Sequence, residues 1–308
     1  NNRFNAIYID GAVNNDVFGL AANGQNGGQT GIAPFSIDAV DQIQVVLSPY
    51  DVSYGGFAGG GINAVTKSGT NEFQGSAYYF LQNEGLAGKT NGTLLERIGS
   101  EEGEKLDDFS STLYGASLGG PIIKDKLFFF VNAEIQRDET PVPFNVEEYE
   151  GDTDEAGLNA LSQFLTDEYG YDAGNFGSKS DKLDGTRIFG KLNYNINKDH
   201  NISFRHQYTK GEQLNVNGSG RTSINFENNG VFFPTTTNAS AIELSSSFGS
   251  KYSNNLIVGY TTVVDDRDPI GQDFPNVRIN DGDGQIFLGS EAFSTANALD
   301  QKILTITD

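Results

Sequence analysis

The residues that most often do chemistry in proteins are sparse in this chain. It has two histidines, His200 in a predicted tight turn and His206 in a predicted strand, and neither has a carboxylate at metal-ligand spacing. The nucleophile motif Gly-x-Ser-x-Gly is absent, and residues 218–220 (GSG) lie in a predicted loop. We find no catalytic constellation, so we predict that the protein is not an enzyme and that both histidines are structural.

Carboxylates are the one chemically active group that is abundant. The segment 138–184 holds thirteen acidic residues and two basic ones. This is typical of a solvated acidic loop; the alternative is Ca²⁺ binding, which takes several carboxylate oxygens. The candidate clusters are 152–155 and 280–284, but the second lacks the EF-hand register. We predict no cofactor and no metal centre, and keep Asp281 and Asp283 as a weaker Ca²⁺ alternative in the loops.

Composition excludes several classes of protein. The chain has 308 residues, no cysteine and a formal net charge of −21, with its positive charges scattered. A nucleic-acid reader would need a basic patch, so we exclude nucleic acid as a partner. The longest apolar run is 127–131 (LFFFV), far below the roughly 18 residues of a membrane helix. If the protein crosses a membrane, it must do so as a closed β-barrel, because open edges and bare backbone are too costly in lipid.

From residue 72 onward, apolar and polar residues alternate with a period of two, which predicts strands with two different faces. In 201–209, Phe204 and Tyr208 share one face, while Arg205 and Gln207 share the other. The same pattern predicts strands at 72–82, 126–137, 186–195, 201–209, 241–249 and 255–263, and position adds weaker ones at 109–119 and 299–307.

The lengths of the connections alternate. The second, fourth and sixth are short turns, and the others are long, at about 83–108, 138–184, 210–238 and 265–298. A transmembrane barrel has this alternation because its periplasmic turns are tight while its outer loops are free to grow. We therefore predict about eight antiparallel strands of an all-β transmembrane barrel, with apolar faces toward lipid. Leucine spacing at 156–169 predicts a short surface helix in the longest connection.

The stretch before these strands has a different texture. Residues 42–47 read as a β-branched strand, 54–61 (YGGFAGGG) carry five glycines in eight residues, and 62–66 read as a strand again. No Gly-Lys-Ser/Thr follows the glycines and no helix opens after them, which argues against a phosphate loop. We expect the glycines to allow close backbone packing against a neighbouring unit.

This stretch resembles a known family. VDQIQV at 40–45, YG at 54–55 and GGINAVTK at 60–67 are similar to the end of the plug domain of TonB-dependent outer-membrane transporters, closest to the Oar-like branch. IYIDG at 7–11 resembles an earlier strand of the same plug, and GSAYYF at 75–80 its first barrel strand. The sequence departs from the family at 48–50, where SPY replaces the Arg-Gly-Pro of many members.

The resemblance implies a fold with two parts. Residues 1–70 would be the C-terminal part of a plug domain inside the lumen, and 71–308 the first part of a transmembrane barrel with long extracellular loops. An eight-stranded barrel has an interior filled by its own side chains, whereas outer-membrane transporters of about 22 strands have a plugged lumen. We therefore expect an open arc of a larger barrel, and a segment of a longer mature protein.

The resemblance also implies sites. Ligand would be bound at the plug apex by Asn14, Asn15, Asp16, Phe18, Gln25 and Asn26. The strand phase projects five charged residues into the lumen, where each needs a partner, so we expect plug–barrel contacts at Glu134, Arg187, Lys191, Arg205 and Glu243. Residues 14–29, as the outward tip, are expected to take no part in those contacts.

The implied function is TonB-dependent active transport of a ligand across the bacterial outer membrane. Its partners would be TonB, through a segment before residue 1, together with outer-membrane lipid and lipopolysaccharide, which acidic loops could meet through Ca²⁺. The alternative is a non-transporting barrel, either a scaffold or subunit of a larger assembly or a conduit for protein export, with an outer-membrane lipoprotein or other subunits as partners. A TonB box would favour transport, and a stoichiometric partner would favour the scaffold.

Overall fold

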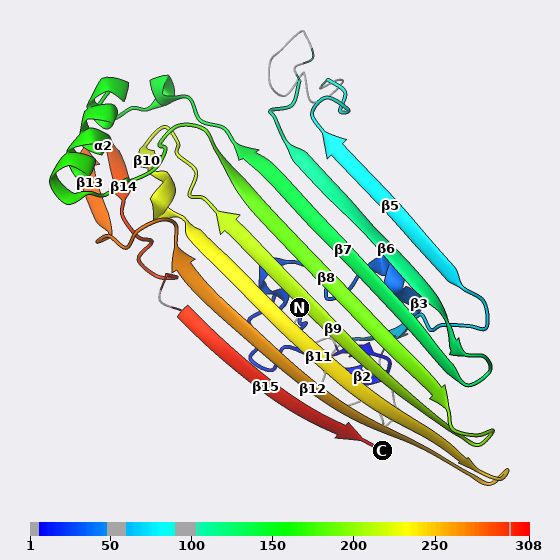
Figure 1. The fold of residues 1–308 in the computed structure, drawn as a ribbon. Helices are drawn as coiled ribbons and strands as arrows, with labels where there is room; N and C mark the ends of the chain where they lie inside the picture. The colour runs from blue at the N-terminus through cyan, green and yellow to red at the C-terminus, as the bar shows by residue number, and fades with distance from the viewer. Residues whose placement is uncertain (1–5, 48–59, 90–102, 104, 296) are drawn as a thin grey trace.

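A computed structural model describes residues 6–47, 60–89, 103, 105–295 and 297–308. Its main element is a wholly antiparallel eight-stranded sheet in the order β15-β12-β11-β9-β8-β7-β6-β5. The strands are Gln74–Asn83 (β5), Ser110–Ile123 (β6), Leu127–Val142 (β7), Lys179–Asn195 (β8), His200–Asn215 (β9), Val231–Phe248 (β11), Tyr252–Pro269 (β12) and Asn297–Thr307 (β15). Figure 1 shows one tilted arc with β5 and β15 at its edges, which confirms the predicted barrel segment.

The connections of this sheet alternate in length as predicted. Three tight turns, at 124–126, 196–199 and 249–251, lie at one end, and the long connections lie at the other (Figure 1). The strands are longer than the apolar pattern indicated: β7 ends at Val142 and β8 begins at Lys179, inside the predicted loop 138–184. The hydrogen-bond ladder continues there between polar residues, and such a ladder leaves no apolar alternation in the sequence.

On this sheet the apolar face is exposed and the polar face is buried, which is the reverse of the arrangement in a soluble protein. Ile188 and Phe204 are 51% and 41% exposed, whereas Arg187 and Arg205, beside them on the other face, are 4% and 5% exposed. The predicted strand phase is therefore confirmed. An apolar outer face and a polar inner face are the pattern of a barrel wall that meets lipid outside.

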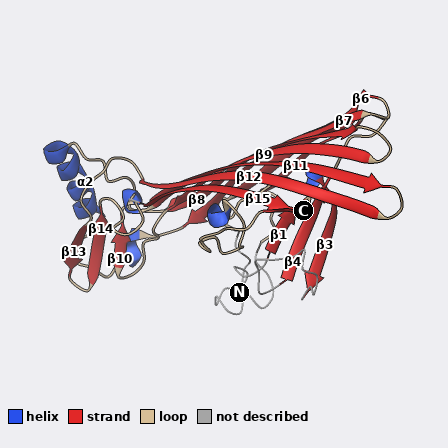
Figure 2. Ribbon diagram, turned by 90° about the horizontal axis from the view of Figure 1, so that it is seen from below, coloured by secondary structure: helices blue, strands red, loops and turns tan. Residues whose placement is uncertain are grey.

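A small N-terminal unit packs against the polar face. It is a four-stranded sheet in the order β2-β1-β4-β3, and β1 runs parallel to β4. Its elements are Ala6–Ile9 (β1), Ala12–Val13 (β2), Gly28–Thr30 (η2), Ile37–Ala39 (η3), Val40–Leu47 (β3) and Gly60–Thr66 (β4). Figure 2 shows this unit lying beneath the sheet, on its inner side. Most of the glycine-rich segment 54–61, for which we expected close packing, lies outside the described residues.

Three of the long connections fold together into a cap beyond the ends of the strands (Figure 2). The cap holds a helix and a sheet in the order β10-β14-β13, around a core that includes Leu158, Tyr171 and Phe226. Its elements are Val146–Glu148 (η4), Glu155–Tyr169 (α2), Ser223–Asn225 (β10), Glu227–Asn229 (η5), Val277–Asp281 (β13) and Gly284–Leu288 (β14). The predicted helix is thus confirmed. None of the helices in the described part of the chain has the length and apolar character needed to span a membrane.

Candidate functional site: the interface between the N-terminal unit and the wall

The N-terminal unit touches the wall through the tight turn between β1 and β2. Asp10 and Gly11 both have positive φ, 45° and 75°, and they join Ile9 to Ala12 as a two-residue hairpin. The sequence Asp-Gly is the usual choice for such a turn, because aspartate tolerates the left-handed region and glycine has no Cβ to strain. A Cβ on Gly11 would also lie 2.7 Å from Cδ1 of Ile257 on the wall, so glycine permits the close approach.

The Asp10 carboxylate joins the hairpin to two wall cations. It accepts hydrogen bonds from the backbone N–H and hydroxyl of Thr66, at 2.8 Å and 2.6 Å, which ties β1 to β4. Lys191 Nζ lies 3.2 Å away and Arg205 Nε 3.5 Å away, and both cations are buried. Arg205 also donates from Nη2 to the carbonyl oxygen of Ile9 at 2.7 Å. We call Asp10, Thr66, Lys191 and Arg205 the hairpin latch.

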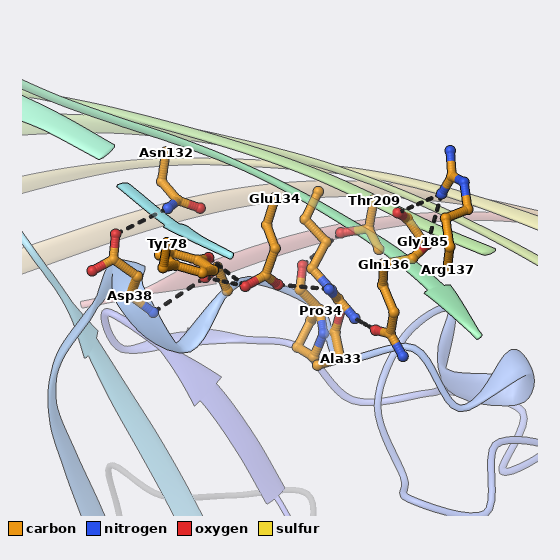
Figure 3. Close-up of polar contacts among 12 residues, drawn as sticks. Ala33, Pro34, Asp38, Tyr78, Asn132, Glu134, Gln136, Arg137, Gly185 and Thr209 are labelled. Atoms are coloured by element: carbon orange, nitrogen blue, oxygen red, sulfur yellow. Dashed lines mark hydrogen bonds and ion pairs between the residues drawn. The ribbon is translucent and has the colours of Figure 1, made fainter. Parts of the chain in front are cut away.

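Glu134 forms a second polar centre, drawn in Figure 3. Its carboxylate accepts hydrogen bonds from Arg187 Nη1 at 2.6 Å, from the Ser36 hydroxyl at 2.8 Å and from the Tyr78 hydroxyl. Arg187 Nε donates to the carbonyl oxygen of Ala33 at 2.9 Å. The ion pair between Glu134 and Arg187 therefore lies within the wall, as does the hydrogen bond from Tyr78, and the hydrogen bonds to Ser36 and Ala33 reach the N-terminal unit.

A third contact region surrounds Asp38 near the start of the barrel. Asp38 lies 3.3 Å from Lys67 Nζ and accepts hydrogen bonds from Ser76 at 2.8 Å and Asn132 at 3.3 Å. The segment between β4 and β5 is bonded to the tight turn 124–126. Asn71 Nδ2 donates to the Asp125 carboxylate, and the Asp125 backbone N–H donates to the Asn71 side-chain oxygen.

Glu243, the fifth charge predicted to contact the plug, is placed differently from the other four. Its hydrogen bonds come from Ser203 and Ser245, both of the wall and both at 3.4 Å. Glu134, Arg187, Lys191 and Arg205 all reach groups of the N-terminal unit, as described above. Ser36 and Tyr78 were not predicted as contact residues. Tyr78 follows Ser76 by two residues and so lies on the same polar face of β5, which is the signal that could have identified it.

The six residues proposed for ligand binding mostly hold their own loop together. Asn15 accepts a hydrogen bond from the Ile7 N–H at 2.7 Å, and Asp16 accepts from the N–H groups of Phe18 and Ala21. Gln25 donates to the carbonyl oxygen of Ile32 at 3.0 Å. Among the six, the structure buries Asn14, Gln25 and Asn26 and half-buries Asn15 and Asp16, and Phe18 is exposed, at 57%.

The expectation that residues 14–29 avoid the wall was wrong. Gln29 donates to Asp265 at 2.8 Å and accepts from Arg267 at 3.3 Å, both on β12. A Cβ on Gly27 would overlap the Thr237 hydroxyl at 2.0 Å, so the loop backbone lies directly on β11. The physical reason is that a polar wall face satisfies a polar, glycine-rich loop as well as water does, and composition does not distinguish the two.

The remaining candidate residues lie apart from this interface. In the described parts of the chain, no group of three or more histidines, cysteines or carboxylates could hold a metal ion. Asp281 accepts hydrogen bonds from Thr153 and Tyr149 in the cap, and Asp283 is exposed beside it. His206 faces outward and contacts the Ser240 hydroxyl at 2.9 Å, and His200 packs edge-on against the ring of Phe248.

Comparisons with known proteins agree with this geometry. A family model described as "Outer membrane beta barrel domain" matches residues 65–149. The TonB-dependent transporter Oar of Myxococcus xanthus is 32% identical over 240 residues, which cover 74% of this chain and 20% of that protein. The chain thus spans about a fifth of the length of this relative.

Solved structures share the fold at low sequence identity. The outer membrane transporter YddB of Escherichia coli has a TM-score of 0.59 at 13% identity, over 98% of this chain and 36% of that one. The siderophore receptor PirA of Acinetobacter baumannii has a TM-score of 0.52 at 15% identity, over 99% and 36%. An apolar-out barrel wall, a unit packed on its inner face and these relatives lead to one conclusion: the chain is an outer-membrane protein that belongs to the TonB-dependent transporter family, in its Oar-like branch.

Proposed function

We propose that the whole protein carries a ligand across the outer membrane, and that residues 1–70 act as a plug that TonB-driven force displaces. One observation carries the proposal: among the described residues, the plug is attached to the wall by polar contacts and not by a large shared core. The apolar clusters that bridge the two parts are small, Ala12 with Ala241 and Ile257, and Ala39 with Phe130 and Phe189. Each charged hydrogen bond contributes a modest free energy, on the order of 1.5–3 kcal/mol, so a pulling force breaks them one after another.

The exposed tip of the plug loop is the part best placed to meet a ligand. Val17, Phe18 and Leu20 are 58%, 57% and 49% exposed, and the loop that carries them touches β12 close to the end that leads into a long connection. Among the six residues predicted to bind ligand, Phe18 is therefore a better candidate than the buried amides Asn14, Gln25 and Asn26. Apolar side chains exposed together favour a ligand that offers an apolar surface.

A single cysteine on the inner wall tests plug displacement. The chain has no native cysteine, and Gln207 is 1% exposed beneath the plug. In cells that carry the full-length protein, we expect Gln207→Cys to react with a membrane-impermeant thiol reagent when TonB is energised, and to stay unreactive in cells without TonB. Lys198→Cys, on an exposed short turn, should not depend on TonB. Equal reactivity of Gln207→Cys in both cell types would refute the proposal.

The scaffold or export-conduit function stays the second candidate, because five of the six predicted ligand residues are half-buried or buried within their own loop. A protein that served as a subunit would co-purify with a partner in fixed stoichiometry, and its Gln207→Cys variant would stay unreactive whether or not TonB is present. The cysteine experiment therefore distinguishes a transporter from a non-transporting subunit, and the fixed stoichiometry of a co-purified partner supports the second candidate.

A further inference from the structure

Arg205 in the hairpin latch is only partly satisfied. Its side chain is 5% exposed, and a guanidinium has five N–H donors in a fixed fork. Nη2 donates to the Ile9 carbonyl, but Nε and Nη1 make no hydrogen bond to any residue that the structure describes, and Nε reaches Asp10 only at 3.5 Å. Both partners, Ile9 and Asp10, belong to the plug. When the plug leaves, Arg205 loses every partner that it has in the docked state.

Glu243 lies one diagonal step away on the neighbouring strand. Arg205 of β9 is in register with Ala241 of β11, and Glu243 with Ser203, so Arg205 and Glu243 project from the same face two residues apart. Side chains in this diagonal relation are within reach of each other when they are long. Glu243 already acts electrostatically on Arg205, although no ion pair joins them. Its two hydrogen bonds, both at 3.4 Å, are at the long limit and are easily given up.

We propose that Arg205 exchanges carboxylates when the plug is displaced, leaving Asp10 of the plug and pairing with Glu243 of the wall. This inference rests on the proposed plug displacement. The exchange needs only a rotation of two side chains, because both strands belong to the fixed sheet. Its effect is to give Arg205 a carboxylate partner in the displaced state, after Ile9 and Asp10 have left it.

The other charges of the inner wall are consistent with this role. Arg187 and Glu134 are paired within the wall and keep their ion pair without the plug. With Arg205 on Glu243, a second wall pair forms, and Lys191 alone loses its carboxylate. Lysine has a flexible stem and a strongly hydrated ammonium group, so it adapts to an open, wet lumen better than a half-satisfied arginine does. Glu243 is thus the wall carboxylate that is available to Arg205 once the plug is displaced.

Single-molecule pulling on the plug of the full-length protein in a lipid bilayer tests the exchange. At constant force, the measured quantity is the fraction of time that the hairpin is displaced. Glu243→Gln should lower that fraction about tenfold, because the displaced Arg205 then meets a neutral amide instead of a carboxylate. Asp10→Asn should raise it, since the docked state loses its two ion pairs. Glu212→Gln makes the same chemical change at the half-exposed ion pair with Lys210, away from the plug, and should match the native protein.

The outcomes separate the exchange from the function on which it rests. If Asp10→Asn leaves the displaced fraction unchanged, the latch does not hold the plug and the exchange is refuted, while the proposed function is decided by the Gln207→Cys experiment. If Asp10→Asn acts but Glu243→Gln equals the native protein, the exchange is refuted and the function stands. In an Arg205→Gln background, Glu243→Gln should have no further effect, and a full effect there would mean that Glu243 acts through another group.

Discussion

At the scale of single residues, Asp10 performs three tasks whose requirements coincide. Its left-handed backbone closes the hairpin, its carboxylate joins β1 to β4 through Thr66, and the same oxygens face Lys191 and Arg205. Few side chains satisfy all three: asparagine keeps the turn but not the charge, and glutamate keeps the charge but not the tolerance for positive φ. The Asp-Gly turn therefore couples the internal structure of the plug to its attachment.

Removing the Asp10 carboxylate should weaken the docking of the plug strongly. We expect Asp10→Ala to destabilise plug docking by roughly 3–5 kcal/mol, because it leaves two buried cations without a partner. Asp10→Asn should cost less, since its amide keeps the turn and the oxygen that accepts from Thr66. Protease protection of residues 1–70 in the full-length protein measures the difference. Equal protection of Asp10→Ala and the native protein would contradict the latch.

The cap offers a prediction about pH. Burial raises the pKa of Asp281, but hydrogen bonds from Thr153 and Tyr149 outweigh it and hold the pKa below its ordinary value of 3.8. Burial and the bond to Asp281 raise the pKa of Tyr149 from 10.0 to about 12. A lowered carboxyl pKa contributes stability above the ordinary value that is lost as pH falls through the lowered one. A raised phenol pKa contributes stability below pH 10 that is lost as pH rises toward 12.

Hydrogen exchange of the cap strands β13 and β14 measures both limits. Protection should be level between about pH 4 and pH 10 and fall on either side. In Tyr149→Phe, the part of the alkaline loss that comes from the Tyr149 phenol should disappear, while the acid loss persists in weaker form because Thr153 still donates to Asp281. An alkaline loss of the same size in Tyr149→Phe would show that another group controls it.

At the scale of elements, the wall strands show how far a sequence specifies structure. The two-residue period predicted the faces of β9 correctly, because lipid on one side and a polar unit on the other give a strong contrast between neighbours. It missed the polar ends of β7 and β8, where the backbone ladder is joined by ion pairs between exposed side chains, Arg137 with Asp184 and Lys182 with Glu139. It also missed the contacts of Gln29, since an amide bonds as readily to a wall carboxylate as to water. The charged inner residues were predictable because a buried charge requires a partner, but the identity of that partner was not.

The strand faces make a direct prediction about membrane assembly. Phe204 is 41% exposed on the apolar face of β9, so Phe204→Arg should destabilise the assembled wall by about 2–4 kcal/mol if the residue lies near the bilayer midplane. Phe204→Leu keeps an apolar side chain and is the matched control. Unfolding in lipid vesicles with urea measures the free energies. An Arg variant as stable as the Leu variant would mean that this face does not meet lipid.

At the scale of the whole molecule, the arc has one end of tight turns and one of long connections, which predicts its orientation in the membrane. Cysteines at Asp167 and Asp283, both exposed in the cap, should react with an impermeant thiol reagent on intact cells. A cysteine at Lys198, on the short turn 196–199, should react only after the outer membrane is permeabilised. The reverse labelling pattern would show that the predicted orientation is wrong and that the cap lies in the periplasm.

The order of the wall strands also has a kinetic consequence. Seven consecutive pairings make up the arc, and each joins a strand to its nearest predecessor in the wall, so this sheet can grow from β5 to β15 as the chain is delivered. The plug reaches its final contacts in a different order. Gln29 meets Asp265 and Arg267 across separations of 236 and 238 residues, so its loop is synthesised early and finds its place late. Because loop closure over such distances is slow, the plug spends the interval without its final partners. During that interval the polar inner face of the half-built wall is open to water, and the seating of the plug marks the end of maturation instead of its beginning.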